Sequence, residues 1–165
     1  MAVGSKVTAT TTQTGNTNFW HPQYMVDGDW DTLVTGGNQS LGWRSDLTAN
    51  PPAGDFYVTI ELDKVYALSQ AILYPEQFVK GAAFPKAYEL QVSVNGESWT
   101  TVATGTNAGV IAESDTAVQP IVHTFEQAQN AKYFRIKITQ HSDELWGSVT
   151  YSAIGEVALM GVAAN

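Results

Sequence analysis

The 165-residue sequence contains no cysteine. Without a thiol, the protein cannot form a disulfide, build a zinc–thiolate site or use a cysteine nucleophile. Its stability must come from a hydrophobic core, with a bound metal as the other available contribution. Long apolar runs are also missing, because none approaches the ~18 residues that a membrane-spanning helix needs.

Basic residues are scarce. Lysine and arginine together number 8 against 16 aspartates and glutamates, which gives a net charge of −8 and a pI of about 4.6. This balance argues against binding to nucleic acid or to an anionic membrane surface, since both require clustered positive charge. Hydrophobic residues make up 44% of the chain and charged residues only 15%, so we expect a folded domain whose partner is neutral.

No long segment shows a convincing 3.6-residue period. Apolar and polar residues instead alternate with the period of a strand, as in Val58-Thr59-Ile60-Glu61-Leu62. Asn95-Gly96 predicts a tight hairpin. The alternation recurs over 89–94 and 134–138, and further strands are expected near 6–10, 68–74, 99–103, 121–126 and 154–160.

These roughly eight antiparallel strands predict an all-β jelly-roll β-sandwich. The length suits a single domain, which we place at residues 6–162, with residues 1–5 as a linker. The first five residues lack the basic start and apolar stretch of a signal peptide. We expect a monomeric module that belongs to a larger chain.

Residues 24–32 form an acidic turn, with three aspartates, a glycine and a threonine. Hard cations such as calcium prefer oxygen ligands of this kind. An EF-hand is excluded, because loop positions six and twelve, counted from Asp27, hold Thr32 and Asn38 instead of glycine and glutamate. A metal site and a solvated acidic turn both remain open on this evidence. Gly155-Glu156 offers a further carboxylate far along the chain.

Three long loops, 33–52, 75–85 and 140–152, carry aromatic and polar residues outside the alternating strand runs. Binding residues usually lie on such loops, so we expect these side chains to be exposed and to form a ligand site. Trp99, which follows the hairpin, is instead expected to lie in the core.

Several motifs in order resemble the family 32 carbohydrate-binding modules of the coagulation factor 5/8 type C, discoidin-like superfamily. The acidic turn Asp27-Gly28-Asp29 with Thr32 is similar to the turn of that family. The other matching segments are Tyr57-Val58-Thr59-Ile60-Glu61-Leu62, Tyr88 to Trp99 (YELQVSVNGESW), Ala131-Lys132-Tyr133-Phe134-Arg135-Ile136 and Tyr151-Ser152-Ala153-Ile154-Gly155-Glu156-Val157.

The resemblance implies a galactose-binding-domain-like jelly roll with one structural Ca²⁺. The implied ligands are the carbonyls of Tyr24, Asp29 and Gly155, the carboxylates of Asp27 and Glu156, and Thr32. Such a metal would connect the acidic turn to the last strand. With the resemblance added, we favour the metal site over a bare turn.

Sugar recognition combines an aromatic ring on the apolar face of a pyranose with planar polar side chains at the hydroxyls. In related galactose binders an arginine and a histidine hold the sugar. Here Glu76 stands at the arginine position and Arg44 near the histidine position, so we expect an altered sugar selectivity. The predicted stacking residues are Trp43, Phe78, Trp146 and Tyr151, and the predicted hydroxyl contacts are Arg44, Asp46, Glu76, Gln77, Asn38 and His141.

The sequence therefore predicts a non-catalytic carbohydrate-binding module of a secreted bacterial glycan-active enzyme. Galactose, N-acetylgalactosamine or a related sugar is the expected ligand, with an affinity on the order of 0.1–1 mM. Two alternatives stay open. A glycoside hydrolase or lyase would need two facing carboxylates from residues such as Asp46, Glu76, Asp143 and Glu144. A discoidin-like adhesion domain, binding protein or membrane, would use Leu145 and Trp146 at a loop tip.

Overall fold

The computed structural model describes residues 2–12, 19–29, 41–45, 56–108, 110 and 118–164, apart from the side chain of Trp146. Thr32, Asn38 and Asp46 lie outside these ranges. The described elements are β1 (Lys6–Ala9), the 3₁₀ helix η1 (Pro22–Val26), β2 (Trp43–Arg44), β3 (Phe56–Tyr74), β4 (Ala87–Ser93), β5 (Thr100–Thr106), β6 (Ile121–Gln140), β7 (Leu145–Trp146), β8 (Val149–Thr150), β9 (Ala153–Ile154) and β10 (Glu156–Ala163).

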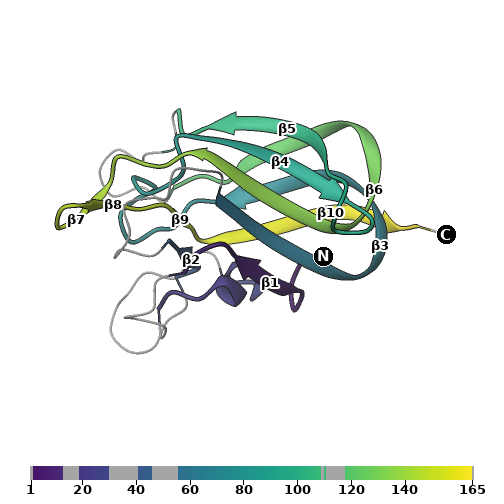
Figure 1. Ribbon diagram of the computed structural model, residues 1–165, viewed down its shortest axis with the longest axis horizontal. Helices are drawn as coiled ribbons and strands as arrows, with labels where there is room; N and C mark the ends of the chain where they lie inside the picture. The colour runs from purple at the N-terminus through teal and green to yellow at the C-terminus, as the bar shows by residue number, and fades with distance from the viewer. Residues whose placement is uncertain are drawn as a thin grey trace.

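The protein is an antiparallel β-sandwich in which β3 and β6 run through both layers (Figure 1). The first half of β3 pairs with β1 and with the second half of β6, which also pairs with β4, and β4 pairs with the edge strand β5. The second half of β3 pairs with β10 and with the first half of β6. The all-β jelly-roll prediction is therefore confirmed.

The expectation of separate strands at 58–62 and near 68–74 was wrong. Both belong to the single strand β3, which continues through Asp63 and Lys64 with a shift in register. These two residues are exposed at the bend, where the strand leaves one layer for the other. A polar interruption in the alternation therefore marks a bend in a continuous strand.

The main core lies between the two layers and consists of the inward-facing residues of the long strands. Val58, Ile60 and Leu62 of β3 are each 1% exposed. Phe134, Ile136 and Ile138 of β6 are equally buried. At 25 cal/mol per Å² of apolar area, such residues stabilise the fold by roughly 1.5–3 kcal/mol each.

The predicted hairpin is present between β4 and β5. Gly96 has a φ of 77°, in the left-handed region that glycine adopts without strain. The Asn95 Oδ1 atom accepts hydrogen bonds from the amides of Glu97 and Ser98, both at 3.0 Å. Within the described ranges, no helix is long and apolar enough to cross a membrane.

Trp99 does not lie in the core as expected. Its ring stacks on the Arg135 guanidinium, with the carbon 3.9 Å from the ring centroid, and is only half-buried. Arg135 also lies 4.2 Å from the ring of Tyr57 and donates a hydrogen bond to Gln91. An outward-facing arginine between two aromatic rings gives the tryptophan a packing partner outside the core.

Candidate functional site

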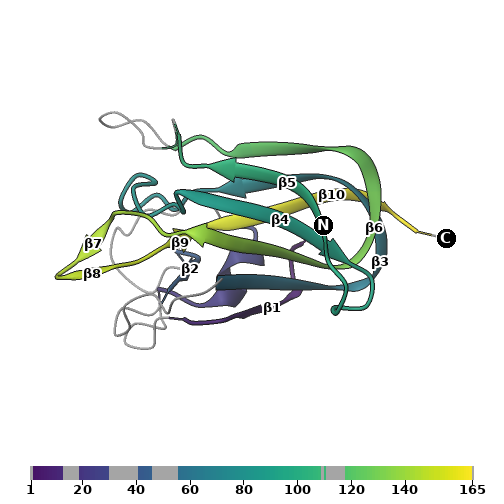
Figure 2. The same cartoon turned by 45° about the horizontal axis from the view of Figure 1, so that its top comes forward.

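The predicted sugar residues come together at one end of the sandwich, which we call the loop end. Figure 2 shows the turn after β3 and the β7–β8 hairpin at this end, together with the short strands β2 and β9. β2 pairs with β9 through Trp43 and Ile154 and through Arg44 and Ala153. A second hydrophobic cluster supports this end and contains Trp20, Leu41, Ala83, Tyr151 and Ala153.

Arg44 is the centre of the loop end. It is only 3% exposed, and its guanidinium carbon lies 3.8 Å from the Tyr151 ring centroid and 5.2 Å from that of Trp20. Burial lowers the pKa of Arg44, while the nearby Tyr151, Glu76 and Glu144 act in the opposite direction. An arginine stays protonated under such conditions, so the loop end holds a buried positive charge.

Glu76 places a buried carboxyl group close to Arg44. It is 1% exposed and accepts hydrogen bonds from the amides of Phe78, at 2.6 Å, and Val79, at 3.1 Å. Burial raises its pKa to about 7, against the lowering effect of these two amides and of Arg44. The sequence predicted that Glu76 would reach sugar hydroxyls, but in this structure its oxygens face the amides of its own loop.

Gln77 was also predicted to contact sugar hydroxyls, but its side chain binds the backbone around the 75–85 loop instead. The Gln77 side chain exchanges hydrogen bonds with the backbone of Val118 and donates a third to Pro75. It is 7% exposed, so it is a structural residue of the loop. Phe78, in contrast, is 48% exposed, as expected of a stacking residue.

Two of the other predicted stacking residues, Trp43 and Tyr151, are buried, unlike Phe78. Trp43 is fully buried and donates from its indole nitrogen to the Thr11 carbonyl at 2.9 Å, so it has no free ring face. Tyr151 is 2% exposed, and its ring contacts Arg44. The prediction that both rings would be exposed was wrong, because the loops form a small core of their own. The side chain of Trp146 and all of Asp46 lie outside the described residues.

The sequence reasoning did not identify the polar contacts that join the loops of this end. Ser45 and Ser152 exchange two hydrogen bonds, one from each backbone amide, across 107 residues of chain. The Ser152 hydroxyl also lies 2.9 Å from Nδ1 of His141, whose pKa is lowered by burial. Lys80 has a φ of 53°, a left-handed conformation that is uncommon for residues other than glycine. His141 was predicted to contact sugar hydroxyls and instead lies against Ser152, while no sequence pattern predicted the pairing of Ser45 with Ser152.

The acidic turn and the start of β10 lie together at a second location. The Gly28 amide donates to Oε1 of Glu156 at 3.3 Å, across 128 residues of chain. Asp27 Oδ1 accepts from the Asp29 amide at 2.9 Å, and Gly28 has a φ of 89°. The structure thus places the acidic turn, through the Gly28 amide, against Glu156.

Two observations fit this place to an oxygen-ligated cation. Glu156 is 3% exposed, and its Oε2 atom is buried without a hydrogen-bond partner among the described residues. Its pKa is raised to about 7 by burial and then by the carboxylate of Asp27, against the effect of the Gly28 amide. A cation at Oε2 would remove both costs. No three acidic or histidine side chains converge within the described part of the chain, so backbone carbonyls such as those of Tyr24, Asp29 and Gly155 would have to complete the ligand set.

Comparison with known protein families matches residues 6–154 to the F5/8 type C domain. The match covers most of the chain, and the protein therefore belongs to this family, as the sequence motifs indicated.

Solved structures of the same fold include several bacterial carbohydrate-binding modules. CBM32-3 from a family 31 glycoside hydrolase of Clostridium perfringens is 24% identical, with a TM-score of 0.67 over 94% of this chain and 91% of that one. The family 32 module of C. perfringens NanJ, in complex with galactose, is 20% identical, with a TM-score of 0.65 over 94% and 92%. Chitosan-binding module 1 of a chitosanase/glucanase from Paenibacillus sp. IK-5 is 20% identical, with a TM-score of 0.63 over 97% and 96%. At these identities the likeness shows the fold.

Proposed function

We propose that this protein is a non-catalytic carbohydrate-binding module that holds a sugar at its loop end. It would serve a secreted bacterial glycan-active enzyme by raising the local concentration of that enzyme at glycans. Proteins of similar structure include a module of Clostridium perfringens in complex with galactose and a chitosan-binding module of Paenibacillus, which supports this class of ligand and setting.

The observation that carries the proposal is the buried Arg44–Tyr151–Glu76 cluster, to which the exposed Phe78 is joined by its backbone amide. An arginine and a glutamate are expensive to bury, and the sandwich core does not need them. Charged groups with perturbed pKa values at the end of a rigid scaffold are typical of functional sites. The cluster therefore fits a preorganised floor for a ligand, with Phe78 as the described ring that can stack on a pyranose.

The charge balance of this end favours some sugars over others. Glu144 is half-buried and lies close enough to influence the pKa of both Arg44 and Glu76, so two carboxylates surround one guanidinium. Carboxylates accept hydrogen bonds and attract cations. Because both oxygens of Glu76 accept from loop amides, Glu144 is the carboxylate of this pair that can accept from a sugar hydroxyl. Galactose-type sugars that present a hydroxyl donor to Glu144 fit this arrangement, and amino sugars fit it better.

Titration calorimetry with galactose, N-acetylgalactosamine and chitosan oligosaccharides tests the proposal. Phe78→Ala should weaken binding by about 1–3 kcal/mol through loss of the ring contact. Val122→Ala is the matched control, because Val122 is 54% exposed on β6 and belongs to no predicted site. Binding that survives Phe78→Ala unchanged, or no binding to any of these sugars, would contradict the assignment.

Catalysis is not expected. Both carboxylate oxygens of Glu76 are committed to loop amides, and Asp143 pairs with Lys86 while its side chain is 79% exposed. A glycosidase needs two carboxyl groups that face the scissile bond. Hydrolysis of chromogenic glycosides that Glu76→Gln or Glu144→Gln abolished would establish the enzyme alternative.

We also propose that Ca²⁺ binds between the acidic turn and β10. Asp27 and Glu156 would supply carboxylates, Tyr24, Asp29 and Gly155 carbonyls, and Thr32 the remaining oxygen. The buried, unpartnered Oε2 of Glu156 is the main support. Calcium would supply positive charge and a crosslink between two distant segments, so its role would be structural.

The adhesion alternative has one observation in its favour. Leu145 is 56% exposed in the β7–β8 hairpin at the tip of the loop end, where an apolar residue can enter a lipid or protein surface (Figure 1). The charge of −8 opposes binding to anionic lipid. Sedimentation with neutral and anionic liposomes separates the two functions, because a sugar-binding module should stay in the supernatant with both.

A further inference from the structure

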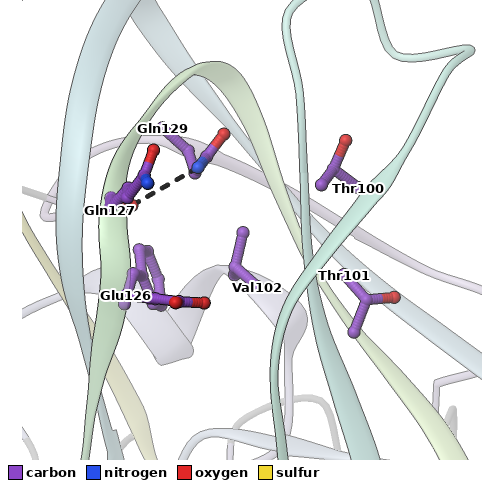
Figure 3. Close-up of a pocket in the computed structure, with 7 residues that line it drawn as sticks. Thr100, Thr101, Val102, Glu126, Gln127 and Gln129 are labelled. Atoms are coloured by element: carbon purple, nitrogen blue, oxygen red, sulfur yellow. Dashed lines mark hydrogen bonds between the residues drawn. The ribbon is translucent and has the colours of Figure 1, made fainter.

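A groove lies at the end of the sandwich opposite the loop end, between the edge strand β5 and the middle of β6. Its larger part has a volume of about 330 Å³ and a smaller continuation about 140 Å³, and the two share Thr100 and Gln129. Figure 3 shows Val102 between the two ribbons, with Thr100 on the β5 side and Gln129 on the β6 side. The groove contains none of the residues of the loop end or of the acidic turn.

The floor and the rim of the groove differ in chemistry. The floor is apolar and includes Val92, Val102 and Phe125, of which Val92 is 3% and Phe125 5% exposed. The rim is made of amides and hydroxyls, namely Ser93, Asn95, Ser98, Thr100, Gln127, Gln129 and Asn130. Glu126 is the one charged side chain among the lining residues.

Several rim groups are available for a ligand. Asn95 uses its Oδ1 atom within the hairpin, which leaves its Nδ2 donor free among the described residues. Gln129 donates from Nε2 to the Gln127 carbonyl at 3.4 Å, as Figure 3 shows, and its Oε1 faces no protein donor in the same ranges. Ser98, Thr100 and Asn130 make no side-chain hydrogen bond within the described part of the chain.

The alternative occupant of a groove beside an edge strand is an added β-strand, which the geometry of β5 disfavours. Leu90 pairs with Ala103 and Gln91 with Thr101, so Val102 is a bulge without a partner on β4. A bulge on an edge strand interrupts the regular ladder and protects the edge from pairing. The side chains of the groove, rather than the backbone of β5, are then the groups that can recognise a ligand.

We propose that this groove is a second carbohydrate site, which takes one neutral sugar residue independently of the loop end. A pyranose has an apolar face for the valine and phenylalanine floor and hydroxyls for the amide and hydroxyl rim. The volume lies at the lower limit of small-molecule sites, which suits a single ring. Glu126 and the net charge of −8 exclude acidic sugars.

The test is NMR chemical-shift mapping on the intact protein with galactose, glucose, N-acetylglucosamine, galacturonate and glycerol as probes. At least one neutral sugar should give saturable shifts at the Thr100 amide and the Gln129 side-chain amide, with no such shifts from galacturonate or glycerol. Thr100→Val, followed at the Gln129 side-chain amide, and Gln129→Leu, followed at the Thr100 amide, should each lower the sugar affinity of the groove about five- to ten-fold, as expected for one lost hydrogen bond. Thr104→Val is the matched control, because Thr104 is exposed on the same strand and does not line the groove.

The loop end reports separately through the amides of Phe78 and Leu145. Phe78→Ala should leave the groove shifts unchanged. The experiment can therefore refute sugar binding at the loop end without refuting it at the groove, and the reverse. The proposal would be overturned if no neutral sugar gave saturable shifts at the groove up to about 20 mM, because a dissociation constant above that concentration is too weak for a binding site. Equal shifts with glycerol, or affinities unaltered in both Thr100→Val and Gln129→Leu, would overturn it as well.

Discussion

The Glu76 carboxylate closes a loop and neighbours a buried arginine at the same time. Its two oxygens accept from the amides of Phe78 and Val79, while burial raises its pKa to about 7. The native state therefore holds a proton on Glu76 more tightly than the unfolded chain, whose carboxyl has the ordinary value of 4.5. The unfolding free energy contributed by this group falls as the pH rises between those two values and is constant above about pH 7.

Glu76→Gln should remove this dependence. Between about pH 5.5 and 7.5, the wild type should lose on the order of 2 kcal/mol relative to the variant, because the cost of the buried charge develops only in the wild type. Denaturant unfolding of both proteins at each pH, in excess Ca²⁺, measures the difference. A constant offset between the two curves would mean that Glu76 is ionised throughout and that its amides and Arg44 outweigh its burial.

The packing of the loop end also depends on Gly42. A Cβ built there would lie 2.2 Å from the Ile154 carbonyl oxygen, and its φ is 104°. Gly42→Ala should cost about 3 kcal/mol or more in unfolding free energy, since both the backbone strain and the β2–β9 pairing are affected. Gly147→Ala is the control: its φ is 66° but nothing lies within 4 Å, so it should cost only about 1 kcal/mol. Equal costs in thermal or denaturant unfolding would show that the contact with Ile154 is not tight.

At the scale of elements, the acidic turn after η1 meets the first residue of β10. Removal of Ca²⁺ by a chelator should lower the melting temperature by about 5–10 °C, because a ligand that binds only the native state stabilises it by mass action. Asp27→Asn should abolish this response while its Oδ1 can still accept from the Asp29 amide. Differential scanning calorimetry with and without chelator gives the measurement.

Asp63→Asn provides the comparison for this effect. Asp63 is exposed at the bend of β3 and accepts a hydrogen bond from Tyr66, far from the acidic turn. The melting temperature of Asp63→Asn should fall on addition of chelator as much as that of the wild type. A wild-type curve that is indifferent to chelator would refute a bound, folding-linked ion.

The strands were predictable from the sequence, and the roles of the loop residues were only partly so. Alternation located the strands because one face of each is buried, as in Val58-Thr59-Ile60. The burial of Trp43 and Tyr151 was missed because irregular loops have no period that reveals which side faces inward. Arg44, placed near a ligand on chemical grounds, lies instead beneath the surface, where two aromatic rings offset its desolvation.

At the scale of the whole molecule, a charge of −8 on 17.8 kDa should keep copies apart at neutral pH. Light scattering after size exclusion should give a single species of 17.8 kDa near pH 7.5 and rising association near the pI of about 4.6. A stable dimer at neutral pH would show that an exposed apolar surface, such as that around Val122 and Met160, overcomes the repulsion.

The C-terminal end of β10 lies at the opposite pole from the β7–β8 hairpin in both views (Figures 1 and 2). A protein anchored to a sensor chip through its C-terminus would present Phe78 and Leu145 to the solution and would turn the β4–β5 hairpin towards the chip. Anchoring through the loops would reverse the presentation. The direction of immobilisation thus decides which end of the protein is accessible to glycans. If both ends bind, a chip anchored through the C-terminus and a chip anchored through the loops should record different glycan profiles from the same molecule.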